Sequence, residues 1–269
     1  MIKPPKLPLF VPGHRANIVP KAAISGADMV IVDLEDAVAT SDKSVARANL
    51  LTIVSQPVLF AVRINASDSP FFSADLDAVK SSQVDMVVLP KAKSPSDLDR
   101  IRDVVGKNIP VLPIIETAAG LAAVQDLLAH PSVPLLAFGH LDFSLDIGAS
   151  SDWENLLFVR SQLVLQSRLA GAAPPLDGVT VSFDDPKIVS NEARRARDLG
   201  FGGKLLVHPR QVAPAQAVFK PSEDDYKWAL SVLDAVADSR SAVKLDGAMI
   251  DMPVIKRAER IKQDFEALV

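Results

Sequence analysis

The chain of 269 residues contains no cysteine and only four histidines. The lack of cysteine excludes disulfide bonds, thiolate metal sites and cysteine nucleophiles, and it suits a reducing compartment. Four scattered histidines do not favour a zinc site built from histidine alone. The sequence also has no Gly-x-Ser-x-Gly motif, so it offers no nucleophile elbow for a serine hydrolase.

Basic charge, aromatic side chains and long apolar runs are scarce as well. The 29 Lys and Arg residues against 33 Asp and Glu give a net charge of −4, so neither a nucleic acid nor a membrane surface is an expected partner. No uninterrupted apolar run reaches the roughly 18 residues of a membrane span. Prolines near the start of the chain fall where a signal peptide needs an apolar helix. We therefore expect a cytoplasmic protein.

Short runs rich in Val, Ile and Leu recur along the chain, with helix-period stretches between them. These runs do not alternate with polar residues, which is typical of strands that a parallel sheet buries on both faces. The expected strands are 7–11, 29–32, 58–64, 86–89, 111–115, 135–138, 176–181 and 204–207. About eight strand–helix units without a linker favour an α/β fold, a (β/α)₈ TIM barrel, over a doubly wound sheet.

The predicted barrel occupies residues 1–220. Residues 221–269 exceed what a barrel needs, and they contain helix-period stretches at 223–237 and from 254 to the end. We expect this segment to be a C-terminal helical extension rather than an independent domain. It either caps the barrel or reaches a neighbouring subunit.

Charged residues follow nearly every predicted strand. Active sites of this fold lie at the carboxyl ends of the strands, so these residues are expected to share one rim. Taken alone, any one of them is more typical of a solvated loop residue or a helix cap than of a ligand. The series is Asp33-Leu34-Glu35-Asp36, Arg63-Ile64-Asn65, Pro90-Lys91, Glu116, Asp142, Asp184-Asp185 and His208.

Arg63 and Glu116 stand out because they lie within or directly after apolar runs. An unpaired charge is costly to bury there unless something compensates it. Glu116 and Asp142, from adjacent units, can supply the one or two protein oxygens that Mg²⁺ usually takes. Arg63 is then placed to bind a substrate carboxylate with two parallel hydrogen bonds.

Three further features have two interpretations each. Thr117 opens a helix directly after Glu116, so it either caps that helix or helps its free N–H groups to bind a substrate anion. The segment Gly200-Phe201-Gly202-Gly203-Lys204 precedes a strand, which favours a turn over a phosphate site. His208, followed by proline, is more typical of a structural hydrogen bond than of a catalytic base.

Taken together, the motifs resemble the HpcH/HpaI aldolase and citrate lyase family, in its branch similar to the citrate lyase beta subunit. The resemblance covers nearly the whole chain. The motifs are Leu9-Phe10-Val11-Pro12-Gly13, Asp33-Leu34-Glu35-Asp36-Ala37-Val38, Val62-Arg63-Ile64-Asn65, Leu89-Pro90-Lys91, Pro113-Ile114-Ile115-Glu116-Thr117, Phe138-Gly139 with Asp142, Asp177-Gly178, Gly203-Lys204, His208-Pro209 and Met249-Ile250-Asp251.

This resemblance implies a Mg²⁺-dependent carbon–carbon lyase. Such an enzyme cleaves or forms a short hydroxyacyl-CoA thioester such as citryl-, malyl- or citramalyl-CoA, with acetyl-CoA and a 2-oxo acid such as oxaloacetate as the other side of the reaction. The resemblance further implies a homo-oligomer, a trimer or hexamer. It makes Glu116 and Asp142 the metal ligands, with Glu35 and Asp36 in the shell behind them.

The resemblance also gives Asp251 the role of catalytic acid or base, often from a neighbouring subunit. From its position alone, Asp251 is equally well the N-cap of the final helix. The chain departs from many relatives at Lys6-Leu7-Pro8 and at His140-Leu141. Two other functions stay open: an aldolase that acts on a free 2-oxo acid without CoA, and a catalytically idle barrel subunit.

Overall fold

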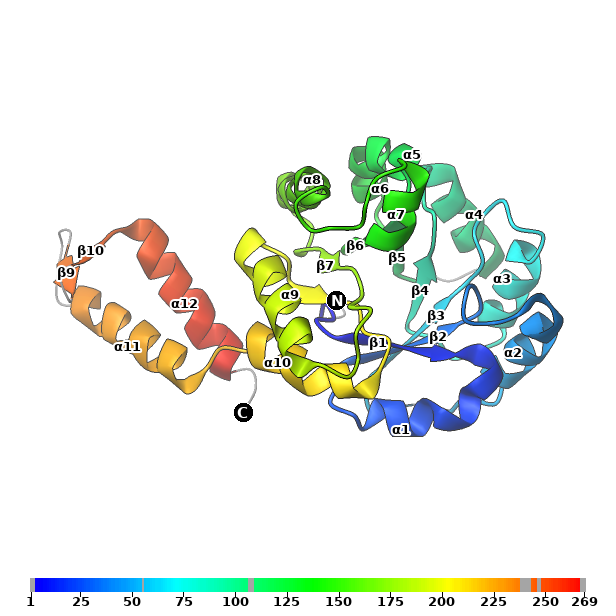
Figure 1. The fold of residues 1–269 in the computed structure, drawn as a ribbon, viewed down its shortest axis with the longest axis horizontal. Coiled ribbons are helices and arrows are strands. Elements are labelled where there is room, and N and C mark those ends of the chain that lie inside the picture. The colour runs from blue at the N-terminus through cyan, green and yellow to red at the C-terminus, as the bar shows by residue number, and fades with distance from the viewer. Residues whose placement is uncertain (1–2, 55, 106–108, 238–242, 246–247, 267–269) are drawn as a thin grey trace. The chain divides into compact units, whose positions relative to one another are not determined.

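The computed structural model describes residues 3–54, 56–105, 109–237, 243–245 and 248–266. The chain forms two compact units, residues 1–215 and residues 216–269 (Figure 1). Within these described ranges, no helix combines the length and the apolar character that a bilayer crossing requires.

The first unit is a (β/α)₈ barrel, as the sequence predicts. Its strands pair in sequence order and all neighbours are parallel. The barrel closes after its last strand through a parallel bridge between Leu9 and Leu206. There the amide of Phe10 donates to the carbonyl oxygen of Leu206 at 2.8 Å. The strands are β1 (Pro8–Pro12), β2 (Met29–Asp33), β3 (Leu59–Arg63), β4 (Met86–Leu89), β5 (Val111–Ile115), β6 (Ala137–Phe138), β7 (Leu176–Asp177) and β8 (Gly203–Lys204).

Every second residue of the strands faces a common core. These inward-facing side chains form one buried cluster, while their neighbours in the same strands, such as Val30 and Val87, are fully buried on the other face. Burial on both faces explains why the strands do not alternate in sequence. The inward cluster comprises Met29, Ile31, Ala61, Met86, Val88, Leu112, Ile114, Leu135, Ala137, Leu176 and Leu205.

Helices follow the strands and surround the barrel (Figure 1). Thr117 caps α5 with its side chain. The helices of this unit are α1 (Val19–Ala23), α2 (Lys43–Leu50), α3 (Phe72–Lys80), α4 (Pro95–Val105), α5 (Ala118–Ala122), α6 (Val124–Ala129), α7 (His140–Asp146), α8 (Leu157–Leu169), α9 (Pro186–Leu199) and the start of α10 (Val212–Phe219), with 3₁₀ turns η1 (Gly13–Ile18), η2 (Thr40–Asp42) and η3 (Pro209–Gln211).

The strand β7 is shorter than the apolar run 176–181 predicts. Beyond Asp177, the backbone carbonyl oxygens accept hydrogen bonds from side chains rather than from a neighbouring strand. Lys204 Nζ donates to the oxygen of Gly178 at 2.6 Å, and Gln211 Nε2 donates to the oxygens of Thr180 and Ser182 at 2.8 and 3.0 Å. Side-chain hydrogen bonding therefore ends the ladder before the apolar run ends.

The second unit is a helical hairpin with a small antiparallel ribbon. Helix α11 (Glu223–Ala237) matches the predicted helix, and α12 (Met252–Glu266) begins two residues before the predicted start. Strands β9 (Val243–Leu245) and β10 (Ala248–Ile250) pair between the helices in sequence. A buried apolar cluster in this unit comprises Ala229, Val232, Ile250 and Ala258.

Closure of the barrel predicts a strong effect of adding a side chain at Gly203. A Cβ there would lie 2.0 Å from the carbonyl oxygen of Lys6. The same oxygen accepts a hydrogen bond from the amide of Lys204. We expect Gly203→Ala to lower the free energy of unfolding by about 1–3 kcal/mol, the usual cost of overpacking. Denaturant unfolding measures this change.

Gly171→Asn is the matched control. Gly171 has φ +69° and open space around its Cβ position within the described part of the chain, and asparagine tolerates that conformation. Equal stability losses in the two variants would contradict the role of Gly203 in closure.

Candidate active site at the carboxyl end of the barrel

The inward-facing positions become charged at the carboxyl ends of three strands. Asp33, Arg63 and Glu116 each lie two residues beyond a member of the interior cluster, in or directly after β2, β3 and β5. Because side chains alternate along a strand, these three groups continue the series that faces the barrel axis. The barrel thus ends in a polar layer directly above its apolar interior.

Asp33 and Arg63 form a buried bidentate ion pair. They are direct partners in the β2–β3 register. Arg63 Nε and Nη2 each donate to an oxygen of Asp33 at 2.7 Å. Asp33 also accepts the amides of Glu35 and Ala37 at 2.9 Å, so its oxygens fix the loop after β2 as well. Burial opposes the charge on Arg63, but the attraction of Asp33 and Glu35 raises its pKa.

Glu35 lies between two cations. Its Oε1 pairs with Lys91 Nζ at 2.7 Å, and its Oε2 lies 2.9 Å from Arg63 Nη1. The second contact is not an aligned hydrogen bond, so Oε2 is buried without a hydrogen-bond partner among the described residues. Burial raises the pKa of Glu35, although Arg63 and Lys91 oppose that rise. Asp36, which is largely exposed, lies 3.3 Å from Arg63 Nη1.

Glu116 is a buried carboxyl group in a close-fitting cradle. Only 3% of the residue is exposed, and its Oε1 accepts the main-chain amide of Lys91 at 2.6 Å. A Cβ at position 139 would lie 2.5 Å from Glu116 Oε2, so Gly139 is needed for this carboxylate to fit. Burial, reinforced by the charges of Glu35 and Asp142, raises the pKa of Glu116 to about 8.

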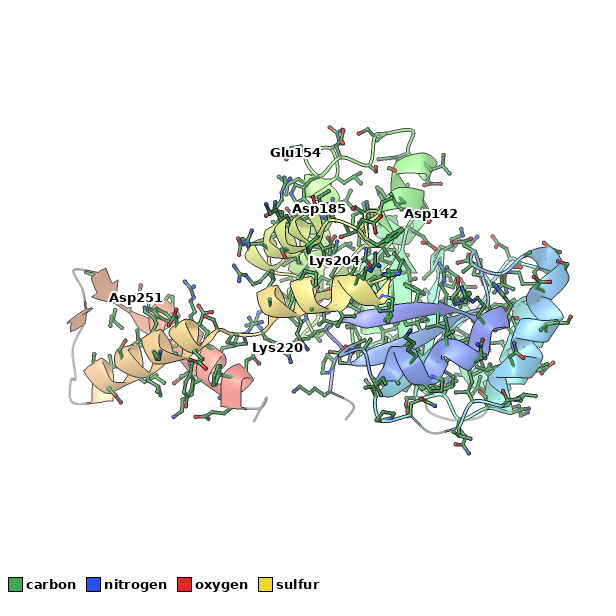
Figure 2. All side chains as sticks on the ribbon, turned by 60° about the horizontal axis from the view of Figure 1, so that its bottom comes forward. Asp142, Glu154, Asp185, Lys204, Lys220 and Asp251 are labelled. Carbon is green, nitrogen blue, oxygen red and sulfur yellow. The ribbon has the colours of Figure 1, made fainter. Side chains whose placement is uncertain are left out.

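Asp142 lies in the first turn of α7 and is half-buried (Figure 2). The charge of Asp142 contributes to the raised pKa of Glu116. Asp146 on the same helix accepts the amide of Ala118 at 2.7 Å, which ties α7 to the start of α5. The described residues contain no group of three or more His, Cys, Asp or Glu side chains arranged to hold a metal.

Thr117 is an ordinary helix cap in this structure. Its Oγ1 accepts the amide of Gly120 at 3.0 Å, and the amide of Ala118 is taken by Asp146. Two of the N–H groups that an anion would need therefore already have partners. Substrate binding by Thr117 stays a prediction.

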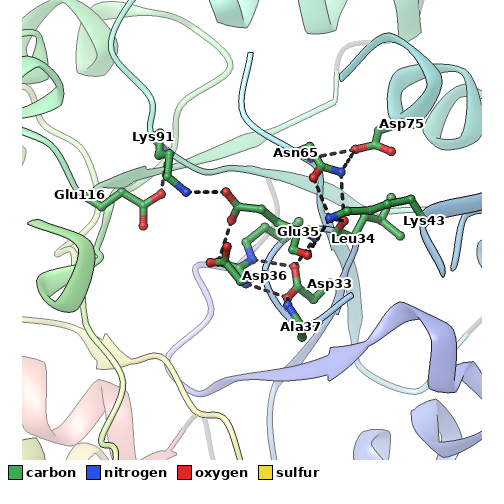
Figure 3. A network of polar contacts seen from close by, with 11 residues as sticks. Asp33, Leu34, Glu35, Asp36, Ala37, Lys43, Asn65, Asp75, Lys91 and Glu116 are labelled. Carbon is green, nitrogen blue, oxygen red and sulfur yellow. Dashed lines mark hydrogen bonds and ion pairs between the residues drawn. The ribbon is translucent and has the colours of Figure 1, made fainter. Parts of the chain in front are cut away.

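A second polar network, which no sequence pattern predicted, supports the loops that follow β2 and β3. Lys43 Nζ donates to the carbonyl oxygens of Leu34 and Glu35 and to Asn65 Oδ1, at 2.6, 2.7 and 2.9 Å. Asn65 Nδ2 in turn donates to Asp75 Oδ2 at 2.6 Å (Figure 3). These residues are buried, so the network fixes the loop that carries Glu35.

A third buried cluster surrounds Asp177 at the end of β7. Arg160 Nε donates to Asp177 Oδ1 at 2.9 Å, and Lys204 Nζ lies 3.3 Å from Oδ2. Burial lowers the pKa of the neighbouring His140 to about 4 against the attraction of Asp177, so this histidine is neutral at pH 7. Lys204 is thus part of an internal ion cluster, and the preceding Gly200 ends α9 with φ +113°.

Two remaining candidates act as caps. His208 accepts the amide of Arg210 at 3.2 Å and stacks on Phe183, in line with the structural interpretation. Asp251 Oδ1 accepts the amide of Val254 at 3.2 Å at the start of α12. This capping contact lies within the second unit, and the catalytic role of Asp251 stays a prediction.

The buried ion pair generates a stability prediction. We expect Asp33→Asn to lower the free energy of unfolding by about 3–5 kcal/mol, because it leaves the Arg63 charge buried without its partner. Denaturant unfolding measures this loss. The matched control is Asp68→Asn, which breaks an exposed pair with Lys93 (2.8 Å) and should cost below about 1 kcal/mol. Similar losses of unfolding free energy in both variants would show that the buried pair contributes no more to stability than the exposed pair.

Glu116 generates a pH prediction. Its pKa is raised from 4.5 to about 8 in the folded protein, so the folded state binds more protons than the unfolded state between these values. Glu116 therefore makes the metal-free protein lose stability as the pH rises from 4.5 to about 8. Unfolding measured across this range should show a shallower decline for Glu116→Gln than for the wild type. Parallel curves would contradict the raised pKa.

Comparisons with known proteins agree with this architecture. The model of the HpcH/HpaI aldolase/citrate lyase family matches residues 6–209. A citrate lyase subunit beta-like protein of Deinococcus radiodurans is 34% identical, and the match covers 94% of each chain. The mitochondrial citramalyl-CoA lyase of Homo sapiens is 30% identical over 95% of this chain and 84% of its own.

The solved structures include a similar protein with ligands bound. The crystal structure of CitE from Mycobacterium tuberculosis in complex with magnesium, acetoacetate and coenzyme A superimposes with a TM-score of 0.87. It is 30% identical to this chain, and the match covers 97% of each. The similarity therefore extends over both units of the chain.

Proposed function

This chain belongs to the HpcH/HpaI aldolase/citrate lyase family, and we propose that within it the chain is a Mg²⁺-dependent carbon–carbon lyase. Its substrate is a short hydroxyacyl-CoA thioester such as citryl-, malyl- or citramalyl-CoA, and its products are acetyl-CoA and a 2-oxo acid. The observation that carries the proposal is the buried Glu116, whose pKa the charges of Glu35 and Asp142 help to raise and which lies two strands along the barrel from Arg63. The CoA ester class is supported by the names of the relatives.

The residues present fit a magnesium ion. Mg²⁺ usually takes one or two protein carboxylates and fills its other positions with water and substrate, so a pair of ligands suffices. Glu116 and Asp142 repel one another, and a divalent cation between them removes that repulsion. Glu35, whose buried Oε2 has no hydrogen-bond partner among the described residues, and Asp36 are the proposed outer shell of this site. When bound, Mg²⁺ supplies Lewis-acid stabilisation to an oxygen of the 2-oxo acid.

Arg63 is the proposed binder of the substrate carboxylate. Asp33 occupies its Nε and Nη2, which fixes the plane of the guanidinium. The Nη1 atom meets Glu35 and the exposed Asp36, whose contact at 3.3 Å is the longest of the set. A substrate carboxylate can replace Asp36 at this edge without disturbing the pair with Asp33. Thr117 lies at the same rim and is proposed to contact the same half of the substrate.

Asp251 is the proposed acid or base. Cleavage of a 3-hydroxyacyl thioester removes the hydroxyl proton, breaks the adjacent carbon–carbon bond and yields the 2-oxo acid. The electron pair remains on the thioester as an enolate, which takes up a proton to become acetyl-CoA. Asp251 would accept the first proton. We propose that a neighbouring subunit supplies it, in the trimer or hexamer that the family resemblance implies.

The alternative function is an aldolase that acts on a free 2-oxo acid without CoA. Glu116, Asp142 and Arg63 all address the oxo-acid half, so they serve both reactions equally. An idle barrel is the weaker alternative, because the chain retains Glu116, Asp142, Arg63 and Asp251 together.

A turnover assay separates these functions. The purified full chain is incubated with citryl-, malyl- or citramalyl-CoA, with Mg²⁺ or with a chelator, and acetyl-CoA and the 2-oxo acid are quantified by chromatography. Equal amounts of both products that depend on Mg²⁺ support the lyase. Cleavage of free 4-hydroxy-2-oxo acids with no turnover of thioesters would instead support the aldolase.

The role of Asp251 gives a kinetic prediction. Asp251→Asn keeps a good helix cap but loses the proton acceptor, so we expect kcat to fall by about 10²–10⁴-fold with unchanged stability. Mg²⁺ affinity, measured by calorimetry, should match the wild type. Wild-type turnover in this variant would leave Asp251 as a cap alone.

A further inference from the structure

Lys91 has an uncommon backbone conformation. Its φ is +49°, and it is the one non-glycine residue with positive φ among those that the structure describes. Residues other than glycine, asparagine and aspartate rarely adopt this left-handed region, because it strains the backbone. Such strain persists only where surrounding contacts determine it, so the contacts of Lys91 need an explanation.

Two contacts hold Lys91 in this conformation, and both lead to carboxyl groups of the site. The main-chain amide donates to Glu116 Oε1 at 2.6 Å. The side-chain ammonium pairs with Glu35 Oε1 at 2.7 Å. Figure 3 shows Lys91 between these two carboxyl groups, with its amide facing one and its ammonium facing the other. The strained residue therefore bridges β2 and β5 across the end of β4.

The amide contact determines which oxygen of Glu116 is free. With Oε1 taken by Lys91, Oε2 lies against Gly139, at the start of the segment that carries Asp142. Among the described residues, the Glu116 carboxylate accepts no second hydrogen bond. With this positive φ, the amide of Lys91 faces Glu116 while its side chain faces Glu35.

We propose that Lys91 is a positioning residue whose main-chain amide, held in the left-handed conformation by the ion pair with Glu35, orients Glu116 for a divalent cation. This inference rests on the proposed function, because it assumes that Glu116 is a metal ligand. The ammonium acts as the anchor that offsets the backbone strain. Residues that adopt the left-handed region readily do not need this anchor.

A substitution series at position 91 tests the assignment. Lys91→Gly and Lys91→Asn remove the ammonium but tolerate positive φ, whereas Lys91→Val removes it and disfavours that conformation. Lys93→Val is the control. Lys93 lies in the same loop, and within the described part of the chain its ion pair is with the exposed Asp68. Mg²⁺ affinity of each full-length, metal-free protein is measured by calorimetry, together with its thermal unfolding.

We expect Lys91→Val to raise the Mg²⁺ dissociation constant about 10–100-fold, the usual effect of losing a partner that orients a metal ligand. Lys91→Gly, Lys91→Asn and the Lys93 control should bind Mg²⁺ like the wild type. Equal losses in all three Lys91 variants would assign the effect to the ammonium and overturn the inference. Wild-type affinity in a folded Lys91→Val protein would overturn it as well.

Crystal structures of metal-free Lys91→Asn and Lys91→Met decide the same question without metal. Methionine lacks the ammonium and retains the flexible side-chain shape, so this variant is expected to fold even if the valine variant does not. The Glu116 carboxylate should keep its place in the asparagine variant and turn away in the methionine variant. An unmoved carboxylate in both refutes the inference, whereas a wild-type protein that binds no Mg²⁺ refutes only the proposed metal site.

Discussion

The rest of the site depends on the buried pair between Asp33 and Arg63. Its two members are register partners on neighbouring strands, so the barrel itself sets their separation. Asp33 fixes the guanidinium plane and, through the amides of Glu35 and Ala37, the loop that follows β2. A buried charge that loses its partner is strongly destabilising. We therefore expect replacement of Arg63 by a neutral residue to perturb folding in addition to the substrate binding proposed for it.

Around this pair, the rim holds an excess of carboxyl groups. Glu35 and Glu116 are both buried and both have raised pKa values, because the nearby cations do not fully offset burial and mutual repulsion. A cation added between Glu116 and Asp142 relieves this repulsion, whereas an apolar ligand does not. The electrostatics of the chain thus favour a site that is completed by a metal ion.

Much of the fold was predictable because parallel strands buried on both faces produce uninterrupted apolar runs. β4 and β5 lie where their runs predict, and α11 matches its helical period. β7 was overestimated, since the side chains that take its carbonyl oxygens come from Lys204 and Gln211, far along the chain. Local sequence patterns carry no information on such distant donors.

The site was predictable to a similar extent. The position of a charge at the end of an apolar run identified Arg63 and Glu116, and the alternation of inward positions could also have identified Asp33 as the partner of Arg63. The support from Lys43, Asn65 and Asp75 joins three separate segments, so no spacing rule indicates it. The left-handed backbone of Lys91 had no signal either, because lysine is not typical of that conformation.

Calorimetric titration with 2-oxo acids tests the central claim most directly. The full-length protein is titrated with oxaloacetate, pyruvate and glyoxylate, each with and without Mg²⁺, and then with acetyl-CoA added. The account predicts that one of these acids binds only when Mg²⁺ is present and that acetyl-CoA strengthens this binding. Binding that is indifferent to Mg²⁺, or no binding of any of the three acids, would contradict it.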